Sequence, residues 1–364
     1  MGGPFFYNSI QPHKCRSRIR NPLINQYCSF CGLFISEDPS VVYLRPESFS
    51  YVNSCIGEHD IILTNMIKKQ RIHLHYTQEA SHISFRHNLV DWLERSARKL
   101  NLSVSTTHLS VAILDIVMSE YAIPSEKMEI MVFTALSIAG KMNDRDELLP
   151  CLKDVPVFFQ KEMSVSELQS CEKVVFEVLD YSVVIQTPYQ FASYFISCGV
   201  ISNIDMNNKY AATVMYEFER MVSLFASSCL KNYELCKFES VVVGAAIVAG
   251  ARKMLGFKHT WTKHLEKLTG ITWSSIYTCF GILERTAIEV YGDELKVKEL
   301  HPTPIKRKST QALNGTEDKE WATVANVSGI DDKQVFVSRF SFSTNSNDEQ
   351  LNCQTYCSQL PDPR

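Results

Sequence analysis

Apolar residues recur at helical spacing through the middle of the chain. Between Ile83 and Leu100 they follow one another at intervals of three and four residues, which predicts an amphipathic helix. Glu126–Met142 and Phe238–Met254 are apolar on nearly every side, a pattern typical of helices at the centre of a bundle. The alternation of apolar and polar residues that marks strands is almost absent. The pattern therefore predicts an all-α fold across residues 58–292.

Short polar motifs mark where further helices begin. Ser105 and Thr106 precede an apolar helical stretch, as N-caps do. Ser164 and Glu167 stand at the spacing of a capping box, and Thr187 is followed by a proline at the first position of another helix. The remaining helices are predicted at Leu109–Tyr121, Val165–Leu179, Tyr210–Ser227, Trp261–Leu268 and Ser274–Tyr291.

The two helices that are apolar all round can be aligned with each other. Thr134–Gly140 in the first resembles Gly244–Gly250 in the second, and small residues fill one face of both. This weak internal repeat favours two similar helical domains, over residues 58–185 and 186–292, and the first range also includes a helix that precedes the repeated unit. A helical bundle without duplication stays open on the pattern alone.

The two ends of the chain differ in texture from the middle. Residues 1–57 mix Pro, Gly, Ser and Asn and show no lasting helical period. Residues 293–364 are polar and rich in Ser, Thr, Asn and Asp. Segments with so little apolar surface cannot bury a core, so both ends are predicted to be disordered extensions.

Charge and cysteine usage exclude several function classes. The 364 residues carry a formal net charge of −3, which supplies no basic field, so we expect no nucleic-acid partner. The purest apolar run, Val241–Ala251, is too short to span a bilayer, and we expect no membrane partner. The 12 cysteines are scattered, and several lie in apolar helical stretches. This favours reduced thiols and a location in the nucleus, the cytoplasm or both.

The chain carries no recognisable catalytic set. It has no glycine-rich phosphate loop, no nucleophile elbow and no supported pair of catalytic acids. Cys28 and Cys31 form one C-x-x-C, which is half a zinc site, and Cys55 with His59 could complete it. Because a second pair at zinc-ribbon spacing is missing, we expect no metal and no other cofactor. The sequence therefore favours a binding protein over an enzyme.

Four fragments of the helical region resemble motifs of the cyclin family and occur in the family's order. They are Phe85–Trp92, Ala139–Asp144, Cys171–Leu179 and Thr187–Phe191. The first keeps the Arg, Leu, Asp and Trp of the first cyclin-box helix, the second a lysine, the third a glutamate, and the fourth the Thr-Pro-x-x-Phe that opens the second box. Two further stretches, His108–Asp115 and Thr260–Thr269, resemble one subfamily.

The resemblance implies two five-helix cyclin boxes in tandem, in a subunit that binds and activates a cyclin-dependent serine/threonine kinase in cell-cycle control. The family's lysine and glutamate, here Lys141 and Glu172, contact the kinase backbone, and Asp144 is the one acid kept from an acidic pair beside the lysine. From the residues alone, Lys141 would complement the end of its helix and Glu172 would be a solvated surface residue. The internal repeat aligns Ala251 with Lys141, so the repeat itself does not demand a lysine there.

The first cyclin-box helix is also a candidate docking site for Arg-x-Leu peptides of substrates or inhibitors. The resemblance assigns Phe85, Leu89 and Trp92 to this groove, and a core-facing stripe is the alternative. Asn88 replaces an apolar residue of the groove, and its desolvation would weaken docking. On the same helix, we expect Arg86 to make internal polar contacts, and Asp91 also to serve structure.

The C-terminal tail contains a candidate phosphosite. Thr303–Lys306 matches the Thr-Pro-x-Lys sequence that cyclin-dependent kinases phosphorylate, so Thr303 is the expected acceptor. Two other functions stay open for the chain: a cyclin-fold transcription factor, and a cyclin-fold scaffold that activates no kinase. The acidic balance and the pairing of Lys141 with Glu172 favour the kinase regulator over the transcription factor.

Overall fold

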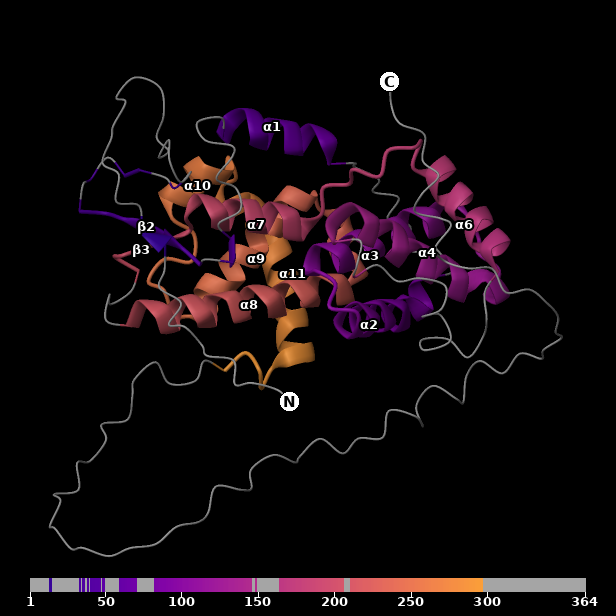
Figure 1. The fold of residues 1–364 in the computed structure, drawn as a ribbon. Helices are drawn as coiled ribbons and strands as arrows, with labels where there is room; N and C mark the ends of the chain where they lie inside the picture. Colours follow the sequence, from indigo (N-terminus) through magenta and orange to yellow (C-terminus); the bar gives the residue numbers. More distant parts are fainter. Residues whose placement is uncertain are drawn as a thin grey trace, which may run out of the picture. The chain divides into compact units, whose positions relative to one another are not determined.

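The structure is a computed structural model, and its described part is almost entirely helical (Figure 1). It describes residues 13–14, 33, 35–36, 38, 40–46, 48–49, 59–70, 82–145, 148, 164–205 and 210–296. The predicted all-α class is confirmed. The tail beyond residue 296, including Thr303, lies outside the described residues, as do Cys28, Cys31 and Cys55.

The first group of helices packs around one buried helix. Its members are α2 (Ile83–Lys99), α3 (Val104–Glu120), α4 (Ser125–Asn143) and α6 (Val165–Val178). All residues from Ile130 to Gly140 are buried, and α4 contacts each of the other helices of the group. The expectation that this apolar stretch occupies a bundle centre is confirmed, because a helix that is apolar all round must bury every face.

The second group repeats this arrangement around α9. Its members are α7 (Pro188–Cys198), α8 (Ala211–Lys231), α9 (Ser240–Met254), α10 (Lys263–Thr269) and α11 (Trp273–Tyr291). Helix α9 contacts α7, α8 and α11 (Figure 1). A side chain at Gly244 would meet Phe191 and the backbone of α7, and one at Gly250 would overlap the ring of Phe225. The small residues of the repeat therefore allow close packing.

The predicted helix starts are confirmed at two positions and differ at a third. Ser164 and Thr187 each form a complete capping box with the residue three positions later. Helix α3, however, begins at Val104, and its N-cap is Ser103 rather than Ser105 or Thr106. Ser103 accepts a hydrogen bond from the backbone N–H of Thr106, so the residue assigned as a cap lies within the first turn.

Charged side chains join the two helical groups. Arg86 of α2 is 4% exposed, and its guanidinium donates to both carboxylate oxygens of Asp115 at 2.7 Å and to the carbonyl oxygen of Leu230 at 2.6 Å. Lys231 pairs with Asp91 and with Glu94 of α2. The structural roles expected for Arg86 and Asp91 agree with these contacts, which connect α2 to the end of α8.

Part of the predicted N-terminal arm packs on the second group. Strand β2 (Tyr43–Arg45) lies antiparallel between β1 (His13–Lys14) and β3 (Ile201–Ser202). Leu44 is buried, and the Arg45 guanidinium donates to the carbonyl oxygen of Ser197 at 2.6 Å. The arm was expected to be irregular throughout. Strands of two or three residues carry no detectable period, and β3, one of the two partners of β2, lies more than 150 residues away along the chain, so the sequence could not indicate this pairing.

Helix α1 (His59–Lys69) also docks on the second group. The His59 ring contacts the carbonyl oxygen of Leu268 at 2.9 Å and the Tyr194 hydroxyl at 2.7 Å. After the helix end, the Gln70 amide accepts from the backbone N–H of Val241 and donates to Glu239. No helix in the described part of the chain combines the length and apolarity needed to cross a membrane.

Candidate functional site

Lys141 and Glu172 meet at the surface of the first helical group. Lys141 stands in the last turn of α4 and Glu172 in the middle of α6. The lysine Nζ lies 2.9 Å from Oε1 of the glutamate, and their side chains are 54% and 22% exposed. The two residues that the family resemblance assigned to one site are therefore adjacent. A pair this exposed contributes at most about 1 kcal/mol to stability, so both charges are available to a partner.

Asp144 faces inward rather than toward this pair. Its carboxylate accepts from the backbone N–H of Ser103 at 3.0 Å and from the Thr106 hydroxyl at 2.5 Å. It thereby joins the end of α4 to the start of α3. Met142, two residues earlier in the chain, is 46% exposed. The kinase contact expected for Asp144 stays a prediction, and its carboxylate already has internal partners.

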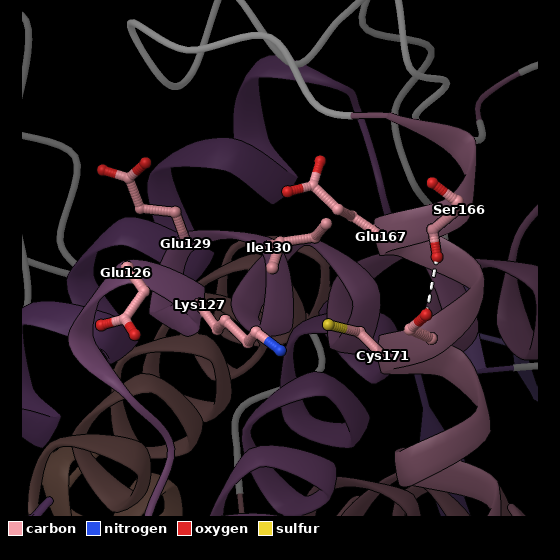
Figure 2. Close-up of a pocket in the computed structure, with 8 residues that line it drawn as sticks. Glu126, Lys127, Glu129, Ile130, Ser166, Glu167 and Cys171 are labelled. Carbon is pink, nitrogen blue, oxygen red and sulfur yellow. Dashed lines mark hydrogen bonds between the residues drawn. The ribbon is translucent and has the colours of Figure 1, made fainter. Parts of the chain in front are cut away.

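A pocket of about 170 Å³ opens between the N-terminal turns of α4 and α6 (Figure 2). Glu126 and Glu129 line it from α4 and Glu167 from α6, while the Lys127 side chain extends toward Cys171. Burial raises the pKa of the Cys171 thiol, which favours its neutral form. The same two helices thus present a mostly acidic pocket in addition to the Lys141–Glu172 pair. The sequence indicated Glu167 only as a member of the capping box with Ser164, and the pocket was not predicted. The one available signal was the spacing of Glu126 and Glu129, which places them near each other on one helix.

The second helical group contains a similar surface pair. Lys253 of α9 lies 2.5 Å from Glu284 of α11, with side chains 45% and 19% exposed. Ala251, which the repeat aligns with Lys141, is fully buried. The second group therefore carries its lysine two positions further along the helix. This pair supplies a matched control, because its exposure is close to that of Lys141 and Glu172.

The candidate docking groove presents little apolar surface. Trp92 is 8% exposed, and Phe85 and Leu89 are partly buried and packed against the hydrophobic core. Asn88 is exposed on the same helix. Among these residues, the core-facing alternative fits Trp92 best, and docking of Arg-x-Leu peptides stays a prediction.

His59 is already engaged within the protein. Its Nε2 contacts a backbone carbonyl, while its Nδ1 lies 2.7 Å from the Tyr194 hydroxyl and 3.6 Å from the Cys198 sulfur. To bind a metal ion, His59 would have to give up one of these contacts. In the part of the chain that the structure describes, no cluster of three or more His, Cys, Asp or Glu residues could hold a metal ion.

Two family models match the helical region in tandem. The cyclin N-terminal domain matches residues 60–184, and the cyclin C-terminal domain matches residues 186–312. Together with the two helical groups, each built around one buried helix, these matches define a protein with two cyclin boxes. The chain belongs to the cyclin family.

The relatives include members of the subfamily that His108–Asp115 and Thr260–Thr269 indicated. Cyclin-J of Xenopus laevis is 21% identical over 65% of this chain and 63% of the relative. The cyclin-J-like protein of Mus musculus is 24% identical over 57% of each chain. The chain thus spans about six tenths of the length of these curated relatives. The predicted resemblance to cyclin J is confirmed.

Two solved structures match the chain at lower sequence identity. A viral cyclin from herpesvirus saimiri has a TM-score of 0.49 and 13% identity, over 65% of this chain and 99% of the viral one. A chain from the crystal structure of a yeast RNA polymerase II CTD kinase complex has a TM-score of 0.40 and 12% identity, over 67% of this chain and 78% of that one.

Proposed function

We propose that this protein is a regulatory subunit that binds and activates a cyclin-dependent serine/threonine kinase through the exposed face of α4 and α6. The observation that carries the proposal is the Lys141–Glu172 pair, 2.9 Å apart on the first box of a chain that belongs to the cyclin family. In the cyclin family the matching lysine and glutamate contact the kinase backbone. The acidic pocket on the same two helices offers further contacts to a basic segment of the kinase.

The physical requirement is a shift in the kinase's own equilibrium. An inactive kinase of this class holds its regulatory helix away, so that its internal Lys–Glu pair cannot form around ATP. Moving such an equilibrium from about 1:99 to 99:1 requires roughly 5.5 kcal/mol of preferential binding to the active form. A mostly apolar interface of about 1,600 Å² is sufficient in size. Lys141 and Glu172 would set the register by hydrogen bonding to backbone groups of the kinase.

The test is affinity purification of the full chain, identification of the co-purified kinase by mass spectrometry, and a kinase assay. Lys141→Glu and Glu172→Lys should each abolish kinase recovery and activation, because a desolvated partner group then faces a like charge at a cost of about 2–5 kcal/mol. Lys253→Glu is the matched control and should leave both unchanged. Helical circular dichroism should be the same for all variants.

The possible results separate the candidate functions. If both first-box reversals recover and activate the kinase normally, the assigned contact is wrong. If the unaltered chain recovers no kinase, the protein is a cyclin-fold scaffold. Recovery of transcription complexes instead of a kinase would favour the cyclin-fold transcription factor.

Three further properties belong to the same proposal. The active complex would phosphorylate Thr303, substrates or inhibitors would dock on α2, and the complex would act in the nucleus, the cytoplasm or both. Labelled ATP and Thr303→Ala test the first property, and a chain tagged with a fluorescent protein tests the location. Equal labelling of the unaltered chain and Thr303→Ala would remove Thr303 as the acceptor.

A further inference from the structure

A cleft separate from the α4–α6 face lies where the two boxes meet. Its volume is about 140 Å³, and it is lined on one side by α3 and on the other by the segment that joins α8 to α9. His108 and Val111 contribute from α3, Leu235 and Val243 from the second box. A group seated there would contact both boxes at once.

One wall of the cleft carries a buried histidine with unused hydrogen-bonding capacity. His108 is 2% exposed, and neither ring nitrogen has a hydrogen-bond partner among the described residues. Its ring stacks on Tyr189, with centroids 5.3 Å apart. Burial lowers the pKa of His108 to about 3, so the ring is neutral and carries one donor and one acceptor nitrogen. A buried polar group without a partner is uncommon in proteins and calls for a specific explanation.

The other polar groups of the cleft offer no unpaired buried charge to a ligand. The Arg86 guanidinium is neutralised by two hydrogen bonds to Asp115. Burial raises the pKa of the Cys236 thiol to about 12, which keeps that thiol protonated. Glu239 is exposed and accepts a hydrogen bond from Gln70. A charged ligand would therefore lose its hydration without gaining a partner of opposite charge.

We propose that this cleft binds a small neutral compound with one aromatic ring and one hydroxyl or amide substituent, which hydrogen-bonds to His108. The size of the cleft supports a single ring, because an engineered apolar cavity of about 150 Å³ in another protein binds benzene. The apolar walls favour a ring, while a hydroxyl or amide can complement either nitrogen of the imidazole. Since the ligand touches α3 and the start of α9, it stabilises the contact between the two boxes.

The test is a titration of the purified full chain with phenol, toluene, benzoate and benzylammonium, followed through the NMR signals of the histidine rings. Phenol should shift the His108 signals and bind about fivefold more tightly than toluene, as one additional hydrogen bond predicts. Benzoate and benzylammonium should bind more weakly than either neutral compound.

Two variants separate the hydrogen bond from the cavity. His108→Phe keeps a ring beside Tyr189 and should bind phenol no better than toluene. Ala112→Leu fills the cleft and should abolish binding of both compounds, whereas Ala122→Leu on an exposed loop should change neither. The proposal is overturned if no compound binds at millimolar concentration, if benzoate matches phenol, or if Ala112→Leu binds like the unaltered chain. His108→Phe should still recover the kinase, because the cleft is separate from the α4–α6 face. Failure of the ligand proposal would therefore leave the proposed kinase contact untouched, and the reverse also holds.

Discussion

Lys141 Nζ lies 2.9 Å from Oε1 of Glu172, so the two residues proposed to hold a kinase already hold each other. Either single charge reversal would remove both this internal pair and the proposed contact to the kinase backbone. The single variants therefore cannot show which of the two losses abolishes kinase binding.

Exchanging the two charges answers that question. The double variant Lys141→Glu/Glu172→Lys restores the internal pair with its polarity reversed, so its stability should lie within about 1 kcal/mol of the unaltered chain. It should nevertheless recover no kinase, because a backbone carbonyl would now face a carboxylate. Urea unfolding and affinity purification measure the two properties. Recovery of normal binding in the double variant would mean that the pair serves only the cyclin itself.

Removal of the Asp115 carboxylate should destabilise the fold strongly. Asp115→Ala leaves the Arg86 guanidinium buried with only the carbonyl of Leu230 as a hydrogen-bond acceptor among the contacts described above. Breaking a buried ion pair from one side costs about 3–5 kcal/mol. Asp91→Ala is the control, since the Asp91 side chain is 48% exposed and its partner Lys231 keeps Glu94. Urea denaturation should show a loss of at most about 1 kcal/mol for the control.

Two glycines in the second box should respond to alanine in opposite directions. A side chain at Gly250 overlaps the Phe225 ring, and overpacking of this kind costs about 1–3 kcal/mol. Gly281 lies in α11 with open space around the added carbon, so alanine there should stabilise the helix by up to about 1 kcal/mol. Thermal unfolding of both variants gives the comparison. Equal effects at the two positions would contradict the close approach of α9 to α8.

The buried His108 should make stability depend on pH. Burial lowers its pKa from 6.5 to about 3, so below pH 6.5 the unfolded chain binds a proton that the folded chain excludes. The neutral His108 therefore does not lower the free energy of unfolding above about pH 6.5. As the pH falls from 6.5 toward 3, the free energy of unfolding decreases by up to about 1.4 kcal/mol per pH unit. Urea unfolding between pH 7 and 4.5 should show a shallower decline for His108→Phe. Parallel curves would show that the imidazole is solvated in the folded state.

Most of the helical architecture could be predicted because helices obey local rules. The periodic stretch at Ile83–Leu100 became α2, and helices began after the predicted caps Ser164 and Thr187 as expected. The all-apolar stretches became the central helices α4 and α9. Cap chemistry and a period of 3.6 residues involve neighbours within one or two turns, so the sequence contains the necessary information.

The sequence pattern by itself therefore determined the helical class and most of the helices. The tandem boxes and the candidate site at Lys141 and Glu172 came from the resemblance of short sequence motifs to the cyclin family. Tertiary structure decided which polar groups meet across long sequence distances. It turned Asp144 toward Ser103, joined Arg45 to Ser197, and left both nitrogens of His108 unpartnered among the described residues. These relationships depend on how separate elements pack, and no local period or spacing encodes the direction of a side chain after packing.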